Sequence, residues 1–143
     1  MTKTESWRTS GVRVVRAATQ ESARRECAGR ATAFDFAGTG GHKTWIGTVT
    51  LQPDQRTGPH HHGRHEVAIY VVKGRSELRW GERLEFRAEV GAGDMVYFAP
   101  FVPHQEINLD PDEPVDFLVV RSDNEKIAPG LALSAVEEPE KVY

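Results

Sequence analysis

Hydrophobic residues along the chain occur in short runs that glycine, proline or charged residues interrupt. Residues 45–51 (W-I-G-T-V-T-L) are rich in β-branched and aromatic side chains, which favours a strand. Residues 66–72 form a second apolar run with hydrophobic side chains on both faces, as in a strand that is covered on both sides. Further strands are predicted at 31–37, 76–80, 84–88, 95–99, 104–109 and 115–121. About eight short strands with turn residues between them indicate an all-β sandwich or barrel.

The two ends of the chain differ from this β-rich region. The sequence shows no internal repeat and no long amphipathic helix, so residues 1–143 are predicted to form a single domain with a barrel core at about 31–121. Residues 1–11 and 124–143 are polar or charged, and we expect them to be extended arms. Residues 20–30 are charged without a strong apolar face, which leaves both a helical turn and a loop open.

Composition narrows the class of protein without indicating its chemistry. The 143 residues carry a net charge of -3 with both signs interspersed, so no basic stripe points to nucleic acid. No apolar run reaches the roughly 18 residues of a membrane span, and the first residues lack the apolar core of a signal peptide. The single cysteine, Cys27, excludes an internal disulfide framework and fits a reducing compartment. We therefore expect a soluble cytoplasmic protein with no membrane partner.

Histidines are concentrated in one stretch. Four of the six lie between Gly58 and Gly74, which reads G-P-H-H-H-G-R-H-E-V-A-I-Y-V-V-K-G. In an extended segment, His60 and His62 point to the same side and His61 points to the other. Two such imidazoles provide part of a site for zinc, iron, nickel or copper, and the remaining ligands have to come from elsewhere. His104, which follows a corner bounded by two prolines, is the candidate.

These stretches resemble the two sequence motifs of the cupin family. The first motif is represented by H-x-H-x3-E within residues 60–66, followed by a glycine. The second is represented by G-D-M-V-Y-F-A and P-H-Q-E-I-N within residues 93–108, where Ala99 replaces the proline of the family. The resemblance covers residues 42–121. It implies an antiparallel β-barrel, of the double-stranded β-helix or jelly-roll type, with a metal ion inside its mouth.

The first motif departs from the family by one residue. Counted back from Gly74, the glutamate position of the family falls on Val67. Either a bulge turns Glu66 inward, or a regular strand leaves Glu66 outside and turns His65 inward. The regular strand is favoured, and the predicted metal ligands are then His60, His62, His65 and His104. Four neutral imidazoles would leave the full charge on the ion, but a catalytic zinc would then need more than four ligands, because four protein ligands close a tetrahedral site.

Glu106 is the predicted catalytic residue. It lies two positions after His104, so a regular strand places both side chains on the same inward face. A carboxylate that faces an apolar interior is costly unless it is paired or lies near a metal. It would act as a general acid or base, or orient a ligand imidazole. The alternative is a local twist that turns it to solvent, to Arg79 or to Arg121.

The blocks H-H-H-G-R-H-E, I-Y-V-V-K-G, R-W-G and F-V-P-H-Q-E-I-N also resemble one branch of small bacterial cupins. These are the stand-alone, zinc-containing cyclases of aromatic polyketide pathways of the resistomycin type. The resemblance implies a Zn²⁺-dependent enzyme that folds a polyketide-like small molecule and activates one carbonyl for intramolecular aldol cyclisation. An Fe²⁺ dioxygenase of a small substrate and a non-enzymatic small-molecule-binding cupin are the alternatives. The apolar outer face of residues 67–72 has to be covered, either by an N-terminal strand or by a second subunit, and we predict a homodimer.

Overall fold

The computed structural model describes residues 7–8, 11, 14–34, 43–123 and 127–143. In chain order its elements are α2 (Ala17–Glu26), β1 (Arg30–Phe34), β2 (Trp45–Leu51), β3 (Val67–Lys73), β4 (Arg75–Trp80), β5 (Phe86–Gly91), β6 (Met95–Phe98), β7 (His104–Ile107), β8 (Val115–Arg121) and β9 (Glu140–Lys141). The strands form a five-stranded sheet of order β1-β2-β8-β3-β6 and a four-stranded sheet of order β7-β4-β5-β9. The predicted all-β fold is confirmed.

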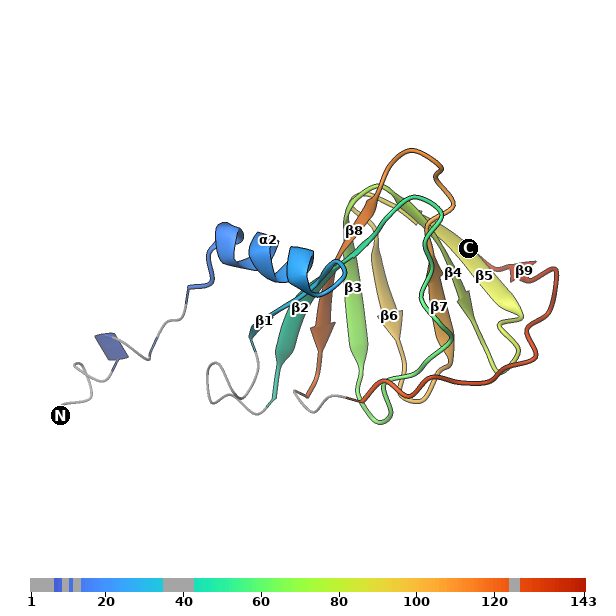
Figure 1. Cartoon of the computed structure of the whole chain (residues 1–143). Helices are drawn as coiled ribbons and strands as arrows, with labels where there is room; N and C mark the ends of the chain where they lie inside the picture. The colour runs from blue at the N-terminus through green and yellow to red at the C-terminus, as the bar shows by residue number, and fades with distance from the viewer. Residues whose placement is uncertain (1–6, 9–10, 12–13, 35–42, 124–126) are drawn as a thin grey trace.

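The two sheets lie against each other and enclose the core (Figure 1). Strand β3 illustrates how the sequence produces this, because Val67, Ile69 and Val71 are buried while Ala68 and Tyr70 face outward. β3 is central in its sheet, between β8 and β6, and both pairings are antiparallel. The buried cluster is apolar and draws on both sheets: Leu51, Val67, Ile69, Val71, Leu78, Phe98, Val115 and Phe117.

Strands β2 and β8 have the predicted bounds, whereas β7 ends at Ile107, two residues earlier than predicted. The reason lies in Asn108, which is 1% exposed and turns its side chain to the neighbouring loops. Its amide nitrogen lies 3.2 Å from the carbonyl oxygen of Leu51, 3.1 Å from that of Gln52 and 2.9 Å from that of Glu113. These bonds tie the end of β7, which begins at His104, to two other parts of the chain.

Residues 17–26 form the helix α2, which settles the choice left open for this region. No side chain of α2 is buried, so the helix is held to the sheet by polar contacts instead of an apolar stripe. Arg24 donates a hydrogen bond to the hydroxyl of Thr48 at 3.1 Å, and Gln20 donates to the carbonyl of Thr32 at 3.0 Å. No helix in the described part of the chain is long and apolar enough to cross a membrane.

The structure describes little of the predicted N-terminal arm but most of the predicted C-terminal arm. Most of residues 1–11, and residues 124–126 of the C-terminal arm, lie outside the described residues. Residues 127–143 run across the open end of the barrel and then beside the four-stranded sheet, where β9 pairs in parallel with β5 (Figure 1). Backbone hydrogen bonds fix this course, since Leu131 donates to Pro59 at 2.9 Å and Val136 donates to Arg83 at 3.0 Å. The described part of the C-terminal arm is therefore held against the barrel.

Candidate metal centre

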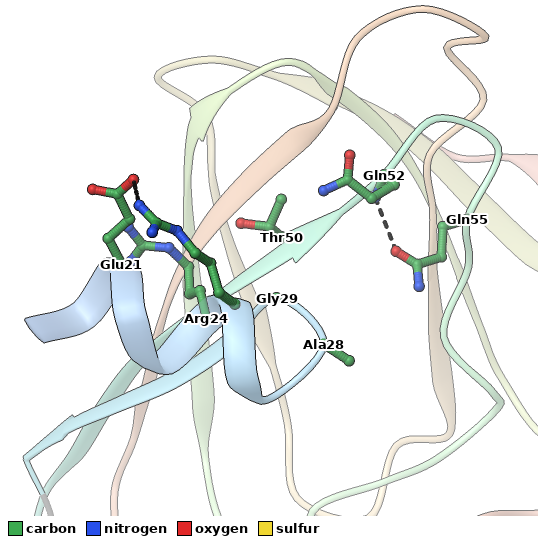
Figure 2. Close-up of a pocket in the computed structure, with 8 residues that line it drawn as sticks. Glu21, Arg24, Ala28, Gly29, Thr50, Gln52 and Gln55 are labelled. Carbon is green, nitrogen blue, oxygen red and sulfur yellow. Dashed lines mark hydrogen bonds and ion pairs between the residues drawn. The ribbon is translucent and has the colours of Figure 1, made fainter. Parts of the chain in front are cut away.

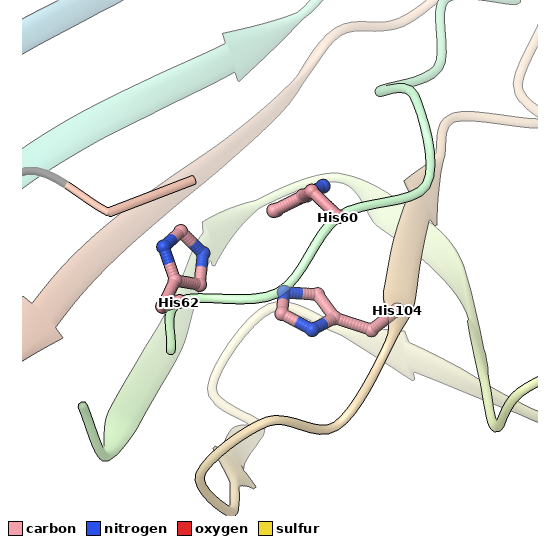
Figure 3. A group of neighbouring side chains, drawn as sticks. All are labelled: His60, His62 and His104. Atoms are coloured by element: carbon pink, nitrogen blue, oxygen red, sulfur yellow. The ribbon is translucent and has the colours of Figure 1, made fainter. Parts of the chain in front are cut away.

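Three histidines from distant parts of the sequence converge at one end of the barrel. His60 and His62 lie in the segment before β3, and His104 is the first residue of β7. Each offers one ligand atom within 4.8 Å of the other two, and Figure 3 shows the three rings around a common centre. The backbones of His60 and His104 form an isolated antiparallel bridge, with hydrogen bonds of 3.0 and 2.8 Å. This bridge brings the pair predicted from alternation next to the third imidazole.

Each of the three rings is oriented through its Nδ1 atom. Nδ1 lies 2.7 Å from the carbonyl oxygen of Gly58 in His60, 2.9 Å from that of Ile127 in His62 and 2.9 Å from that of Val102 in His104. A carbonyl oxygen can only accept, so Nδ1 carries the proton and Nε2 carries the lone pair. A metal-ligating histidine uses this arrangement, in which a backbone carbonyl fixes the tautomer.

The surroundings of the Nε2 atom of His104 indicate whether the three histidines fit a metal ion. It is buried and makes no hydrogen bond to any residue that the structure describes. Buried polar atoms in native proteins nearly always have a partner, so an inward lone pair without one calls for a bound group. Imidazole nitrogen is a preferred ligand of zinc and of iron. The donor set of His60, His62 and His104 therefore fits a divalent metal ion.

The environment also keeps these imidazoles in the state that binds a metal. Burial, together with the nearby rings of His60 and His104, lowers the pKa of His62 to about 4. Burial likewise lowers the pKa of His104, although the carboxylate of Glu106 opposes the shift. Both rings are therefore neutral at pH 7, and a metal ion does not have to displace a proton from either one.

Glu106 faces the same centre. Its Oε1 atom lies 3.7 Å from Nε2 of His104, and its Oε2 atom lies 3.9 Å from Nε2 of His60. Thr57 fixes the carboxylate, because its hydroxyl donates to Oε2 at 2.9 Å and accepts from the backbone N–H of Glu106 at 3.0 Å. The side chain of Glu106 is 13% exposed and forms no ion pair with an arginine among the described residues. The strand thus turns Glu106 inward, and the alternative twist is not seen.

The structure shows which of His65 and Glu66 points inward. Glu66 is exposed and accepts a hydrogen bond from the hydroxyl of Tyr97 at 2.7 Å, so no bulge turns it inward. His65 is 1% exposed and lies on the inward side with Val67, as a regular strand requires. Its ring is nevertheless outside the group whose ligand atoms lie within 4.8 Å of one another. The ring of His61 is also outside that group, and its Nδ1 accepts a backbone hydrogen bond at 2.8 Å.

His60, His62 and Glu106 border a cavity of about 610 Å³ inside the barrel. Its inner wall is largely apolar and includes Trp45, Ile69 and Phe117. The C-terminal segment adds Ala128 and Gly130 to the lining. An apolar chamber with a few converging polar groups is the usual form of a small-molecule site.

Sequence reasoning missed several residues of this site. Thr57 carries no motif signal, and it supports Glu106 only because the fold brings the two together. The carbonyl of Ile127 supports His62 through the backbone, which no side-chain pattern reveals. Arg121 was considered only as a partner for Glu106, yet it lines the cavity without pairing with it.

A second hollow, of about 420 Å³, lies outside the barrel between α2 and β2 (Figure 2). Charged and amide side chains border it, including Glu21, Arg24, Gln52 and Gln55. Glu21 forms an ion pair with Arg25 one helical turn further on. The hollow contains none of the predicted site residues, and its polar groups do not converge on one point.

Comparisons with known proteins agree with this architecture. A family model described as Cupin_2, a cupin domain, matches residues 47–121. No curated protein has a significant match to the chain. Among solved structures, an uncharacterized conserved protein from Klebsiella pneumoniae with a double-stranded beta-helix domain has a TM-score of 0.67 at 18% identity, over 85% of this chain and 98% of that one. At this identity the likeness concerns the fold alone, and it confirms the predicted double-stranded β-helix.

Two further solved structures are enzymes. The polyketide cyclase RemF from Streptomyces resistomycificus has a TM-score of 0.62 at 25% identity, over 77% of this chain and 73% of that one. An oxalate oxidase in complex with the substrate analogue glycolate has a TM-score of 0.62 at 19% identity, over 72% of this chain and 55% of that one. The same fold therefore occurs in enzymes with different chemistry, and the choice between them depends on the site.

Proposed function

The chain belongs to the cupin family, and from this premise we propose that it is a metal-dependent cyclase of an aromatic polyketide chain. The observation that carries the proposal is the set of three imidazoles with Nδ1 anchored and Nε2 directed inward, beside a carboxylate and an apolar chamber. The likeness to the polyketide cyclase RemF supports the choice of substrate class.

Zn²⁺ is the proposed metal, held by His60, His62 and His104. Three protein ligands leave a zinc ion with an open position, which is the arrangement of catalytic zinc sites. His65, which the motif spacing predicted as a fourth ligand, lies inward but outside the group of three, and the proposal does not depend on it. The same donors would suit Fe²⁺, so an iron dioxygenase remains the alternative that the experiment has to separate.

A bound metal would supply Lewis-acid polarisation of a ketone carbonyl. The protein's own residues would transfer the proton and position the substrate. Glu106 accepts the proton from the carbon between two carbonyls, and that carbon then forms a bond to a second carbonyl carbon of the same substrate. The proton returns to the oxygen of the attacked carbonyl, which completes the aldol. Thr57 holds the carboxylate in place by donating to its Oε2 atom, which leaves Oε1 for the proton.

Metal content and oxygen uptake test the proposal. We expect purified protein to hold one equivalent of zinc and to cyclise a poly-β-ketone substrate without consuming oxygen. His62→Ala should lose both the metal and the activity. His61→Ala is the matched control, because the ring of His61 lies outside the group of three, and this variant should keep both. Stoichiometric iron with oxygen uptake would replace the cyclase by the dioxygenase.

The role of Glu106 has a separate test. Glu106→Gln keeps the shape of the side chain and an acceptor for Thr57, but removes the basic oxygen. We expect kcat to fall by about 100-fold or more, the usual contribution of a general base, while zinc content stays unchanged. An unchanged kcat would remove Glu106 from the mechanism without affecting the metal site.

We further propose that the protein is a homodimer that buries the outer face of β3 and β6. β6 is an edge strand of the five-stranded sheet, and the face carries exposed apolar side chains: Tyr70, Val72, Met95 and Tyr97. Met95 is 79% exposed, which is unusual for a large apolar side chain without a partner surface. Light scattering at micromolar concentration should give twice the chain mass, and Met95→Glu should lower it. A monomeric wild type would refute the dimer.

A further inference from the structure

Arg121, the last residue of β8, lines the same cavity as His60, His62 and Glu106. It is 6% exposed, and its Nε atom is buried without a hydrogen-bond partner in the described part of the chain. No carboxylate among the described residues forms an ion pair with it. Buried charges in proteins are normally paired, because an unpaired one has lost its water without compensation. A charged group that is kept in such a place calls for a ligand of opposite charge.

The guanidinium group is held in a fixed position. Its Cζ atom lies 3.9 Å from the centre of the Trp45 ring, so one face of the group is stacked on the indole. The indole lies against Gly47, where a Cβ atom would come within 2.4 Å of the ring. Stacking covers the face of a guanidinium but leaves its N–H edge for a planar partner, and a carboxylate matches that edge with two oxygens.

The charges in the cavity also favour a negatively charged ligand. Glu106 is the one acidic residue among the described residues that line it, and Thr57 holds it on the side of His60 and His104. Arg121 keeps its charge at neutral pH, because a guanidinium is not deprotonated in proteins. A divalent ion at the histidines would raise the positive charge further, and Glu106 would cancel only part of it. The positive charge in the cavity thus favours the binding of an anion.

We infer that Arg121 binds a carboxylate of the substrate, so that the substrate enters the barrel as a free organic acid. The inference rests on the proposed function for the role of the metal, but the anion site stands on Arg121 and Trp45 alone. It names the substrate class as a carboxylic acid whose apolar or carbonyl-bearing part extends toward the histidines. A neutral ester or amide of the same shape would lack the partner for the guanidinium.

Salicylate and salicylamide test the inference, because they share an aromatic ring and hydroxyl group and differ in charge. Binding is measured by calorimetry to metal-free and to zinc-loaded protein. We expect salicylate to bind the wild type more tightly than salicylamide, and Arg121→Gln to weaken salicylate by about tenfold or more in both forms. Binding of salicylamide should not change. Arg75→Gln, the same substitution at an exposed arginine outside the cavity, should leave both ligands unaffected.

The outcomes separate this inference from the proposed function. The inference is overturned if Arg121→Gln binds salicylate as the wild type does, if salicylamide binds equally well, or if the wild type binds no salicylate at millimolar concentration. A wild type that takes up no zinc would overturn the proposed function, while the metal-free titration would still decide the role of Arg121. Arg121→Lys keeps the charge without the planar fork and should bind with intermediate affinity, which gives a second variant if Arg121→Gln does not fold.

Discussion

Replacing Asn108 by aspartate exchanges an N–H donor for an acceptor at a point where acceptors surround it. The amide nitrogen of Asn108 faces the carbonyl oxygens of Leu51, Gln52 and Glu113, all within 3.2 Å. Its Oδ1 atom accepts from the backbone N–H of Asp110 at 3.0 Å, and the substitution preserves this contact. Asn108→Asp therefore changes the donor side while leaving the size of the side chain nearly the same.

The size of the effect follows from these contacts. The two lost N–H donors contribute about 1 kcal/mol each, and the carbonyl of Leu51, in a buried position, loses its partner at a cost of about 1–3 kcal/mol. The carbonyls of Gln52 and Glu113 are only partly buried, so water compensates there. We expect the free energy of unfolding at pH 7 to fall by roughly 3–5 kcal/mol, a large part of the ~5–15 kcal/mol of a small domain.

The loss should also depend on pH in a specific direction. Burial and the surrounding carbonyls raise the pKa of the introduced carboxyl above its unfolded value of about 3.9. The protonated carboxyl restores one donor, so the deficit relative to wild type is smallest near pH 4 and grows to its full size as the pH rises through the folded pKa.

Urea unfolding followed by tryptophan fluorescence at pH 5 and pH 7 measures both effects. Gln52→Glu is the matched control, because it makes the same amide-to-acid change on an exposed neighbouring side chain, and it should cost less than about 0.5 kcal/mol. A loss below 1 kcal/mol for Asn108→Asp at pH 7, or an equal loss at both pH values, would refute the assignment of the amide as the donor that joins the loops.

Three shorter predictions concern the barrel and its site. Gly74→Ala should destabilise the protein by about 2–4 kcal/mol in urea unfolding, since φ of Gly74 is +84° and the new Cβ would lie 2.4 Å from the carbonyl oxygen of Pro114. Gly58→Ala is the control and should be nearly neutral, because a Cβ at Gly58 would have no atom within 4 Å. Metal-free protein should lose stability as the pH falls from about 6.5 toward 4, because the lowered pKa of His62 means that the native state binds fewer protons than the unfolded state in this range. With allowance for the partial exposure of the ring, the free energy of unfolding should fall by roughly 1–2 kcal/mol. Urea midpoints that do not change with pH would contradict this prediction. Chelation of the zinc ion proposed above should lower the Tm by several degrees and added zinc should restore it, whereas the Tm of His104→Ala should respond to neither.

Much of the architecture could be predicted because it depends on local patterns. Strands β2 and β8 have the predicted bounds, since short β-branched and aromatic runs between turns specify extended chain wherever they lie. The alternation of side chains likewise settled the orientation of His65 and Glu66, because the period of a strand is fixed by its backbone. The spacing of the two motifs indicated that His60, His62 and His104 would meet.

Only the tertiary structure decided how the site is completed. The alternation of buried and exposed residues extends back from β3 to His65, which lies inward, but whether its ring reaches the other three depends on the turn at residues 63–64, where no repeating pattern applies. The polar C-terminal segment gave no periodic signal, and its contribution, a carbonyl at Ile127 and small residues along the cavity, exists only through long-range packing. The unpaired state of Arg121 is likewise a property of the assembled barrel. The sequence by itself determined which side chains alternate and in what order, because these follow from backbone geometry; the partners of each side chain were decided by folding, because segments far apart in sequence supply them.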